Sequence, residues 1–167
     1  GTIVSLFGTG LAPAETAVQA LSTPLPTSLA GVTVTINGVL APLFAVKAGQ
    51  FDQINIQVPF ATMGPTATII VNNNGTLSNS VEVNIAATSP GIFSVTSNGI
   101  GPGTITHLDF SLVTEKNPAV PGEFVSIFLT GLGSVNPPVS DGVAGLTNPL
   151  SHAVDTPNMH VWFNNEL

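Results

Sequence analysis

Alternation of apolar and polar residues with a period of two is the feature that most constrains this chain. It runs through residues 32–37, 54–58, 67–72 and 81–85. A β-strand that buries one face and exposes the other shows this period, because successive side chains point to opposite sides. The pattern therefore predicts an all-β fold of antiparallel strands packed as a β-sandwich.

Turn residues separate the alternating segments. Asn37-Gly38 and Asn73-Asn74-Gly75 predict hairpins, because asparagine and glycine tolerate the positive φ that tight hairpins require. Met63-Gly64-Pro65 predicts a third turn. Fourteen prolines and seventeen glycines disfavour helices. Only residues 14–21 are a candidate for one or two helical turns.

The chain contains an internal repeat. Residues 1–11, GTIVSLFGTGL, share Gly, Val, Ser, Phe, Thr, Gly and Leu with residues 122–132, GEFVSIFLTGL. Further along, residues 32–40, VTVTINGVL, align with residues 159–167, MHVWFNNEL. Such self-similarity indicates two copies of one structural unit.

The repeat divides the chain into three predicted parts. They are a first sandwich domain at 1–88, an ordered Gly/Pro-rich connector at 89–118, and the first part of a second domain at 119–167. We expect the second domain to be incomplete, because nothing follows it that corresponds to residues 41–85. Half a sandwich exposes apolar surface and unpaired strand edges. We therefore expect completion by another subunit through β-strand addition, by further sequence, or by packing on the first domain.

Charge excludes several classes of partner. Only 7% of the residues are charged, against roughly a quarter in ordinary soluble proteins, and the net charge is −7. Lys47 and Lys116 are the two basic residues, so nucleic acid and anionic membrane surfaces are excluded as partners. No apolar run reaches the roughly 18 residues that membrane insertion needs. A polar surface of Thr, Ser and Asn is typical of proteins outside cells, so we expect a secreted or cell-surface protein.

Three stretches of the chain resemble an uncharacterised C-terminal domain family of large secreted proteins of soil bacteria. They read GTIVSLFGTGLAP, TPLPTSLAGVTVTINGVLAPLFAVKAGQFDQINIQVP, and SPGIFSV followed by NPAVPGEFVSIFLTGLGSVNPPVSDG. The first domain is also similar to IPT/TIG-type immunoglobulin-like domains in GTGL, the NG hairpin, FDQINIQVP and NNNGTLSNSVEVNI. The resemblance implies tandem immunoglobulin-like β-sandwiches, the second incomplete, in an accessory region without established catalytic residues.

No catalytic residue, cofactor site or metal ligand is predicted. The chain has no cysteine and no GxSxG nucleophile motif. His152, Asp155 and His160 match no established zinc-ligand spacing and are interpreted as loop residues. Asp141-Gly142 has no oxygen-rich neighbours for calcium and is interpreted as a turn, as is the Asn74-Gly75-Thr76 glycosylation pattern. We therefore expect a protein that is not an enzyme.

Trp162 is the side chain most suggestive of binding. The repeat aligns it with Thr35 and places it on the strand face opposite Val161 and Phe163. An outward tryptophan is typical of a contact with the connector or another subunit, and a sugar-stacking platform is the alternative. The residues predicted to contact a partner are Trp162, His160, Phe124, Phe128 and Phe163.

These observations favour a non-catalytic extracellular structural or adhesive module. Such a module could be a self-assembling surface or filament subunit that binds other protein subunits or domains. The alternative is a carbohydrate- or ligand-binding accessory module of a secreted enzyme. Only Trp162 offers the exposed aromatic surface that sugar binding requires, so the sequence favours the structural role.

Overall fold

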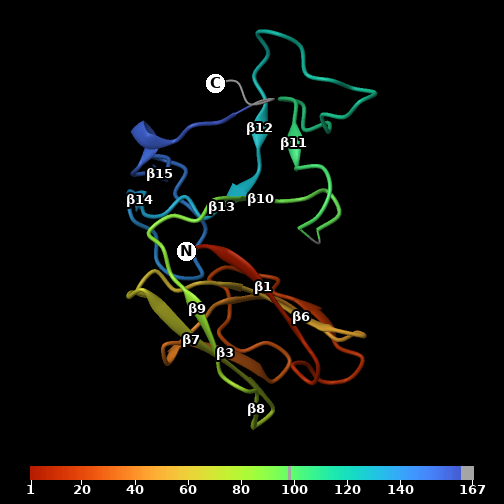
Figure 1. The fold of residues 1–167 in the computed structure, drawn as a ribbon, viewed down its shortest axis with the longest axis vertical. Coiled ribbons are helices and arrows are strands. Elements are labelled where there is room, and N and C mark those ends of the chain that lie inside the picture. The colour runs from red at the N-terminus through yellow and green to blue at the C-terminus, as the bar shows by residue number, and fades with distance from the viewer. Residues whose placement is uncertain (98, 163–167) are drawn as a thin grey trace. The chain divides into compact units, whose positions relative to one another are not determined.

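The computed structural model describes residues 1–97 and 99–162 and is all-β, as the alternation predicted (Figure 1). Its strands form antiparallel sheets. The helical structure in this described part is a single 3-10 turn, η1 (Thr156–Asn158). The chain divides into two compact units. The larger unit joins Gly1–Ala87 to the segment that starts at Leu132, and the smaller unit is Thr88–Gly131.

Two sheets make up the first half of the larger unit. The first sheet has the order β1 (Ile3–Gly8), β6 (Asp52–Gln57), β5 (Leu43–Lys47), β2 (Ala17–Gln19). The second has the order β4 (Val39–Leu40), β3 (Val32–Ile36), β7 (Thr66–Asn73), β8 (Thr76–Leu77), and β9 (Val81–Asn84) also pairs with β7.

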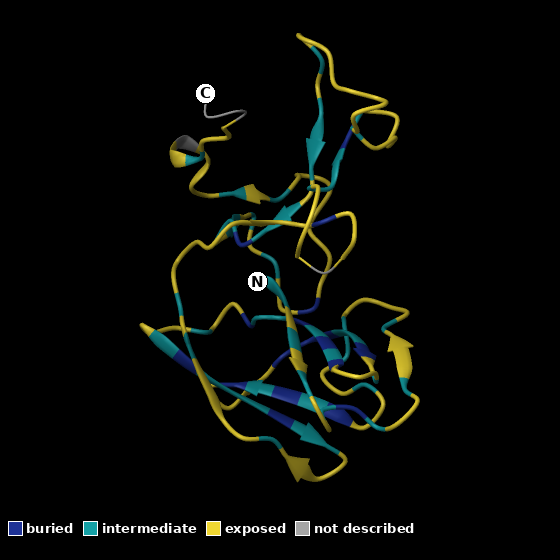
Figure 2. Cartoon of the chain, turned by 45° about the vertical axis from the view of Figure 1, so that its right-hand side comes forward, coloured by how far each residue is buried: buried dark blue, intermediate teal, exposed yellow. Residues whose placement is uncertain are grey.

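The core lies between these two sheets, as the dark-blue strands of Figure 2 show. The alternating pattern of the sequence decides which residues form the core, because β3 and β6 bury every second residue. Both sheets therefore contribute one apolar face, which is the arrangement of a β-sandwich. The buried apolar residues are Ala12, Val32, Val34, Ile36, Ala41, Leu43, Val46, Ile54, Ile56, Ala67 and Val71.

Both Asn-Gly hairpins are confirmed. Asn37 and Gly38 have φ of 50° and 79° and connect β3 to β4, whose pairing places Ile36 opposite Val39. Asn74 and Gly75 have φ of 49° and 92° and connect β7 to β8. Positive φ at both central residues matches the right-handed twist of the strands that flank the turn.

The candidate helix at residues 14–21 is wrong. Ala17–Gln19 forms β2, which pairs with β5 through Ala17–Lys47 and Val18–Val46. A helix of two turns is marginal by itself, because its nucleation is costly. Pairing on the edge of an existing sheet satisfies the backbone groups at lower cost.

The segment that starts at Leu132 contains one short strand pair, β14 (Val135–Asn136) with β15 (His152–Ala153), followed by η1. The alignment with residues 32–40 predicted a strand at 159–164. Its described part, residues 159–162, belongs to no strand. A strand forms only where a neighbour supplies a hydrogen-bond ladder, and the described residues supply none at this position.

The smaller unit contains two strand pairs. They are β10 (Gly91–Ile92) with β13 (Leu129–Thr130), and β11 (Ile105–Thr106) with β12 (Ser126–Ile127). Strands of the predicted connector thus pair with strands of the predicted second domain. The tandem arrangement of two sandwiches, and the three-part division of the chain, stay predictions.

Candidate interaction surface

The smaller unit has no apolar core among its described residues. The residues buried in it are Ser94, Thr106 and Gly131, and every described aliphatic or aromatic side chain remains partly exposed. Figure 2 shows this as teal and yellow ribbon with little dark blue. Backbone hydrogen bonds, rather than buried hydrocarbon, hold this unit together.

One strand of the smaller unit changes its pairing partner at Phe128. Before this residue, β12 pairs with β11, and after it β13 pairs with β10. The Phe128 N–H donates to the Thr104 carbonyl at 3.0 Å, and the Phe128 carbonyl accepts from the Phe93 N–H at 3.0 Å. Each ladder is therefore only two residues long, which leaves the apolar side chains of this strand poorly covered.

Two pairs of equivalent repeat positions resemble each other in exposure or in backbone conformation. Phe7 on β1 and Phe128 occupy the same place in the repeat, and both are exposed. Gly10 and Gly131 also coincide, with φ of 71° and 82°. A Cβ on Gly131 would lie 2.0 Å from the Ser89 carbonyl oxygen, so this position requires glycine. In the larger unit the same motif forms one continuous six-residue strand, β1.

The smaller unit exposes more large apolar side chains for its length than the larger unit does. Single exposed apolar residues are normal on a protein surface. A unit that exposes most of its large apolar side chains indicates a contact surface. We call the exposed apolar side chains of the smaller unit the apolar display. Its members are Ile92, Phe93, Val95, Ile100, Leu108, Phe110, Leu112, Val120, Phe124 and Phe128.

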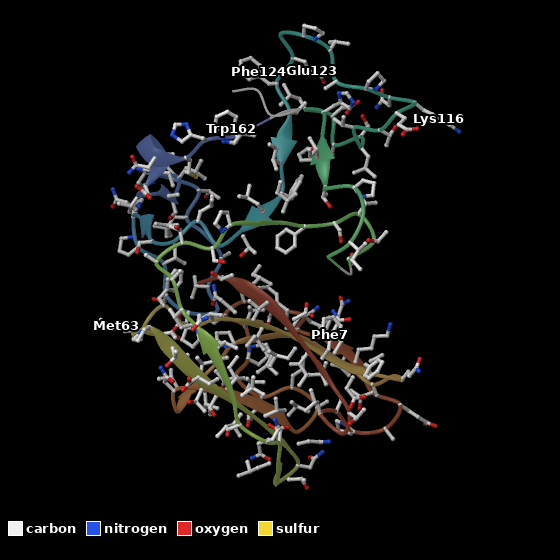
Figure 3. The ribbon with its side chains drawn as sticks, viewed as in Figure 1. Phe7, Met63, Lys116, Glu123, Phe124 and Trp162 are labelled. Atoms are coloured by element: carbon white, nitrogen blue, oxygen red, sulfur yellow. The ribbon has the colours of Figure 1, made fainter. Side chains whose placement is uncertain are left out.

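Two predicted contact residues belong to the apolar display. Phe124 is 77% exposed and Phe128 is 41% exposed. Phe124 precedes β12, beside Glu123, and both are labelled in Figure 3. Their exposure makes both available to a partner.

The remaining predicted contact residues lie in the larger unit or outside the described residues. Trp162 is 59% exposed and His160 is exposed. Neither lies on a strand, so the predicted outer-face position of Trp162 is wrong. Phe163 lies outside the described residues. The structure thus assigns Phe124 and Phe128 to one unit, and His160 and Trp162 to the other.

Sequence reasoning missed an ion pair in the smaller unit. His107 Nδ1 contacts Glu123 Oε1, and His107 Nε2 lies 3.3 Å from the Asn117 carbonyl oxygen. The hydrogen bond to Glu123 raises the pKa of His107, and the same bond lowers the pKa of Glu123. No local pattern could have indicated this pair, because the partners are 16 residues apart.

Sequence reasoning also missed a buried carboxylate at the start of β6. Asp52 accepts hydrogen bonds from the N–H groups of Leu11 at 2.8 Å, Ala12 at 3.2 Å and Gly49 at 3.2 Å. It borders a shallow depression lined mainly by glycine and alanine. Since its oxygens are occupied by backbone donors, Asp52 anchors the loop after β1 and does not serve as a reactive group.

The predicted Asp141-Gly142 turn also attaches its segment to the sandwich. The Gly142 N–H donates to Gln57 Oε1 at 2.6 Å, and its carbonyl accepts from the Leu25 N–H at 2.7 Å. Asp141 Oδ1 accepts from the Phe60 N–H at 2.8 Å. Gly142 has φ of 73° and is buried. The turn is confirmed, and its carboxylate serves as a hydrogen-bond acceptor for the backbone.

The described residues contain no group of three His, Asp or Glu side chains placed to hold a metal ion. No helix in this part of the chain is long and apolar enough to cross a membrane. Comparison with family models, with curated proteins and with solved structures found no match.

Proposed function

We propose that this chain is a non-catalytic structural or adhesive module of a secreted or cell-surface protein, and that it self-associates through the apolar display. One observation carries the proposal. The smaller unit keeps every described aliphatic and aromatic side chain at least partly exposed, while the sandwich beside it in sequence buries a full apolar core.

Apolar contact is the chemistry that such a surface supports. Covering one large apolar side chain contributes about 1.5–3 kcal/mol, so several of them supply the free energy of a specific contact. The chain carries two basic and nine acidic residues. Copies of the chain carry the same net charge, so self-association gains nothing from long-range electrostatic attraction and has to depend on apolar contact.

Strand addition is the mode of contact that the backbone supports. Two-residue ladders such as β11–β12 and β10–β13 can be extended by a strand from a second subunit. Head-to-tail addition that does not close into a ring builds a filament. A surface of Thr, Ser and Asn suits an extracellular assembly, and apolar contact has to outweigh the repulsion that a net charge of −7 sets between copies.

Sedimentation velocity over a wide range of protein concentrations tests this proposal. We expect the chain to form oligomers as its concentration rises, and Phe124→Ser to weaken this association without lowering the melting temperature of the sandwich. Phe51→Ser, which changes an exposed phenylalanine of the larger unit, is the matched control. A chain that stays monomeric throughout, or equal effects of both variants, would contradict the proposal.

Carbohydrate binding remains the alternative, since the exposed indole of Trp162 is suited to stacking on a sugar ring. Trp162 is the single tryptophan of the chain, so its fluorescence reports this site alone. Soluble polysaccharides should leave the emission unchanged if the module is structural. A saturable shift of the emission would favour the accessory binding module instead.

A further inference from the structure

The loop of residues 107–123 in the smaller unit depends on polar contacts for its conformation. It contains three tight turns, in which Phe110 N–H donates to the His107 carbonyl, Asn117 N–H to the Thr114 carbonyl, and Glu123 N–H to the Val120 carbonyl. Leu108, Phe110 and Val120 are largely exposed. Since apolar packing contributes little, the contacts between the turns decide whether the loop keeps this shape.

Two side chains at the ends of the loop make several of those contacts, and the Asn117 amide adds one by donating to the Leu112 carbonyl at 3.2 Å. His107 holds the third turn through Glu123 Oε1 and approaches the second turn at the Asn117 carbonyl. Glu123 Oε2 accepts from the Val120 N–H at 2.9 Å. The two side chains are only 14% and 21% exposed. One imidazole and one carboxylate therefore connect all three turns.

The loop also contains a strained residue. Phe110 has φ of 66°, in the left-handed region that residues with a bulky side chain rarely adopt. Its side chain is 78% exposed, so burial does not offset the strain. Loss of the contact between His107 and Glu123 would let this turn relax.

We propose that His107 and Glu123 form a pH-dependent clasp, which holds the 107–123 loop closed when both side chains are charged and releases it when either is neutral. The clasp is a property of the loop and does not rest on the proposed self-association. Where that association occurs, the clasp would control how Leu108, Phe110 and Val120 are presented to the partner.

The direction of the pH dependence follows from the charges that face His107. Besides Glu123, the carboxylate of Asp109 also favours the protonated imidazole. The hydrogen bond to Glu123 is the main cause that raises the pKa of His107 above 6.5. The contribution of His107 is therefore complete below pH 6.5 and is lost as the pH rises through the raised pKa.

Glu123 sets the acidic limit of the clasp. Its pKa lies below the ordinary value of 4.5, because it is hydrogen-bonded to His107. Its contribution is complete above pH 4.5 and is lost as the pH falls through the lowered pKa. The closed loop is thus most stable between pH 4.5 and pH 6.5.

Backbone hydrogen exchange of the whole chain, corrected for the intrinsic pH dependence of exchange, tests the clasp. We expect the N–H groups of Val113, Asn117 and Glu123 to be more protected at about pH 5.5 than at about pH 8.5. Each unit of pKa shift changes the opening equilibrium by up to about tenfold. The N–H groups of β6 in the sandwich serve as an internal reference.

Variants complete the test. His107→Gln and Glu123→Gln should each abolish the pH dependence of protection in the loop, while His152→Gln should retain it. An NMR titration of His107 provides a measurement that does not require a variant to fold. A His107 pKa at or below 6.5, or loop protection that does not change with pH, would overturn the proposal.

Discussion

Replacement of Asp52 by alanine would test how the sandwich holds the loop after β1. The carboxylate accepts three backbone N–H groups, from Leu11 at 2.8 Å and from Ala12 and Gly49 at 3.2 Å. A hydrogen bond to a charged group contributes about 1.5–3 kcal/mol. The two longer bonds are weaker, and water from the adjacent depression can reach the freed donors. We therefore expect the free energy of unfolding to fall by about 3 kcal/mol.

Urea and thermal denaturation followed by far-ultraviolet circular dichroism measure this loss. A change of 1 kcal/mol shifts the melting temperature of a domain of 60–100 residues by about 4–8 °C, so a fall of roughly 12–24 °C is expected. Glu82→Gln removes an exposed carboxylate from β9 and is the matched control. A loss below about 1 kcal/mol, the value typical of surface pairs, would refute the anchoring role of Asp52.

The pH dependence of a second variant, Asp52→Asn, gives an independent test. Burial by itself would raise the pKa of Asp52, but hydrogen bonds from the backbone of Gly49, Ala12 and Leu11 outweigh it and hold the pKa below 3.8. The stabilisation is therefore present above pH 3.8 and is lost as the pH falls through the lowered value. The stability difference between the wild type and Asp52→Asn should shrink between about pH 5 and about pH 2. A constant difference over this range would contradict the argument.

Three further predictions concern turns and metal ions. Gly142→Ala should destabilise the protein more than Gly38→Ala. Both glycines have positive φ, which costs an alanine about 1–2 kcal/mol. Only at Gly142 would the new Cβ also lie 3.1 Å from the backbone N and O of Leu25. If urea denaturation showed the same loss of stability for both variants, the predicted clash at Leu25 would be wrong. Asn37→Ala should cost about 1 kcal/mol and speed hydrogen exchange at Thr68, whose N–H donates to Asn37 Oδ1 at 2.8 Å. EDTA should leave the melting temperature unchanged, and a marked drop would reveal a metal site.

Part of the candidate surface could be predicted from the sequence. Phe124 and Phe128 were predicted as contact residues because an incomplete second sandwich cannot bury its apolar strand positions, and both side chains are exposed. Trp162 was placed on a strand by alignment alone. That placement was wrong, because similar residues form a strand only where a neighbouring strand can pair with them.

The sequence by itself determined several strands and two tight turns of the sandwich. The alternation in β3 and β6 and the Asn37-Gly38 hairpin depend on the preferences of adjacent residues, so a local pattern is sufficient to predict them. Only the tertiary structure decided which distant groups meet. Asp52 binds the N–H of Leu11 from 41 positions away, and His107 pairs with Glu123 across a loop. These contacts depend on how the whole chain packs, and packing between distant segments leaves no periodic pattern in the sequence.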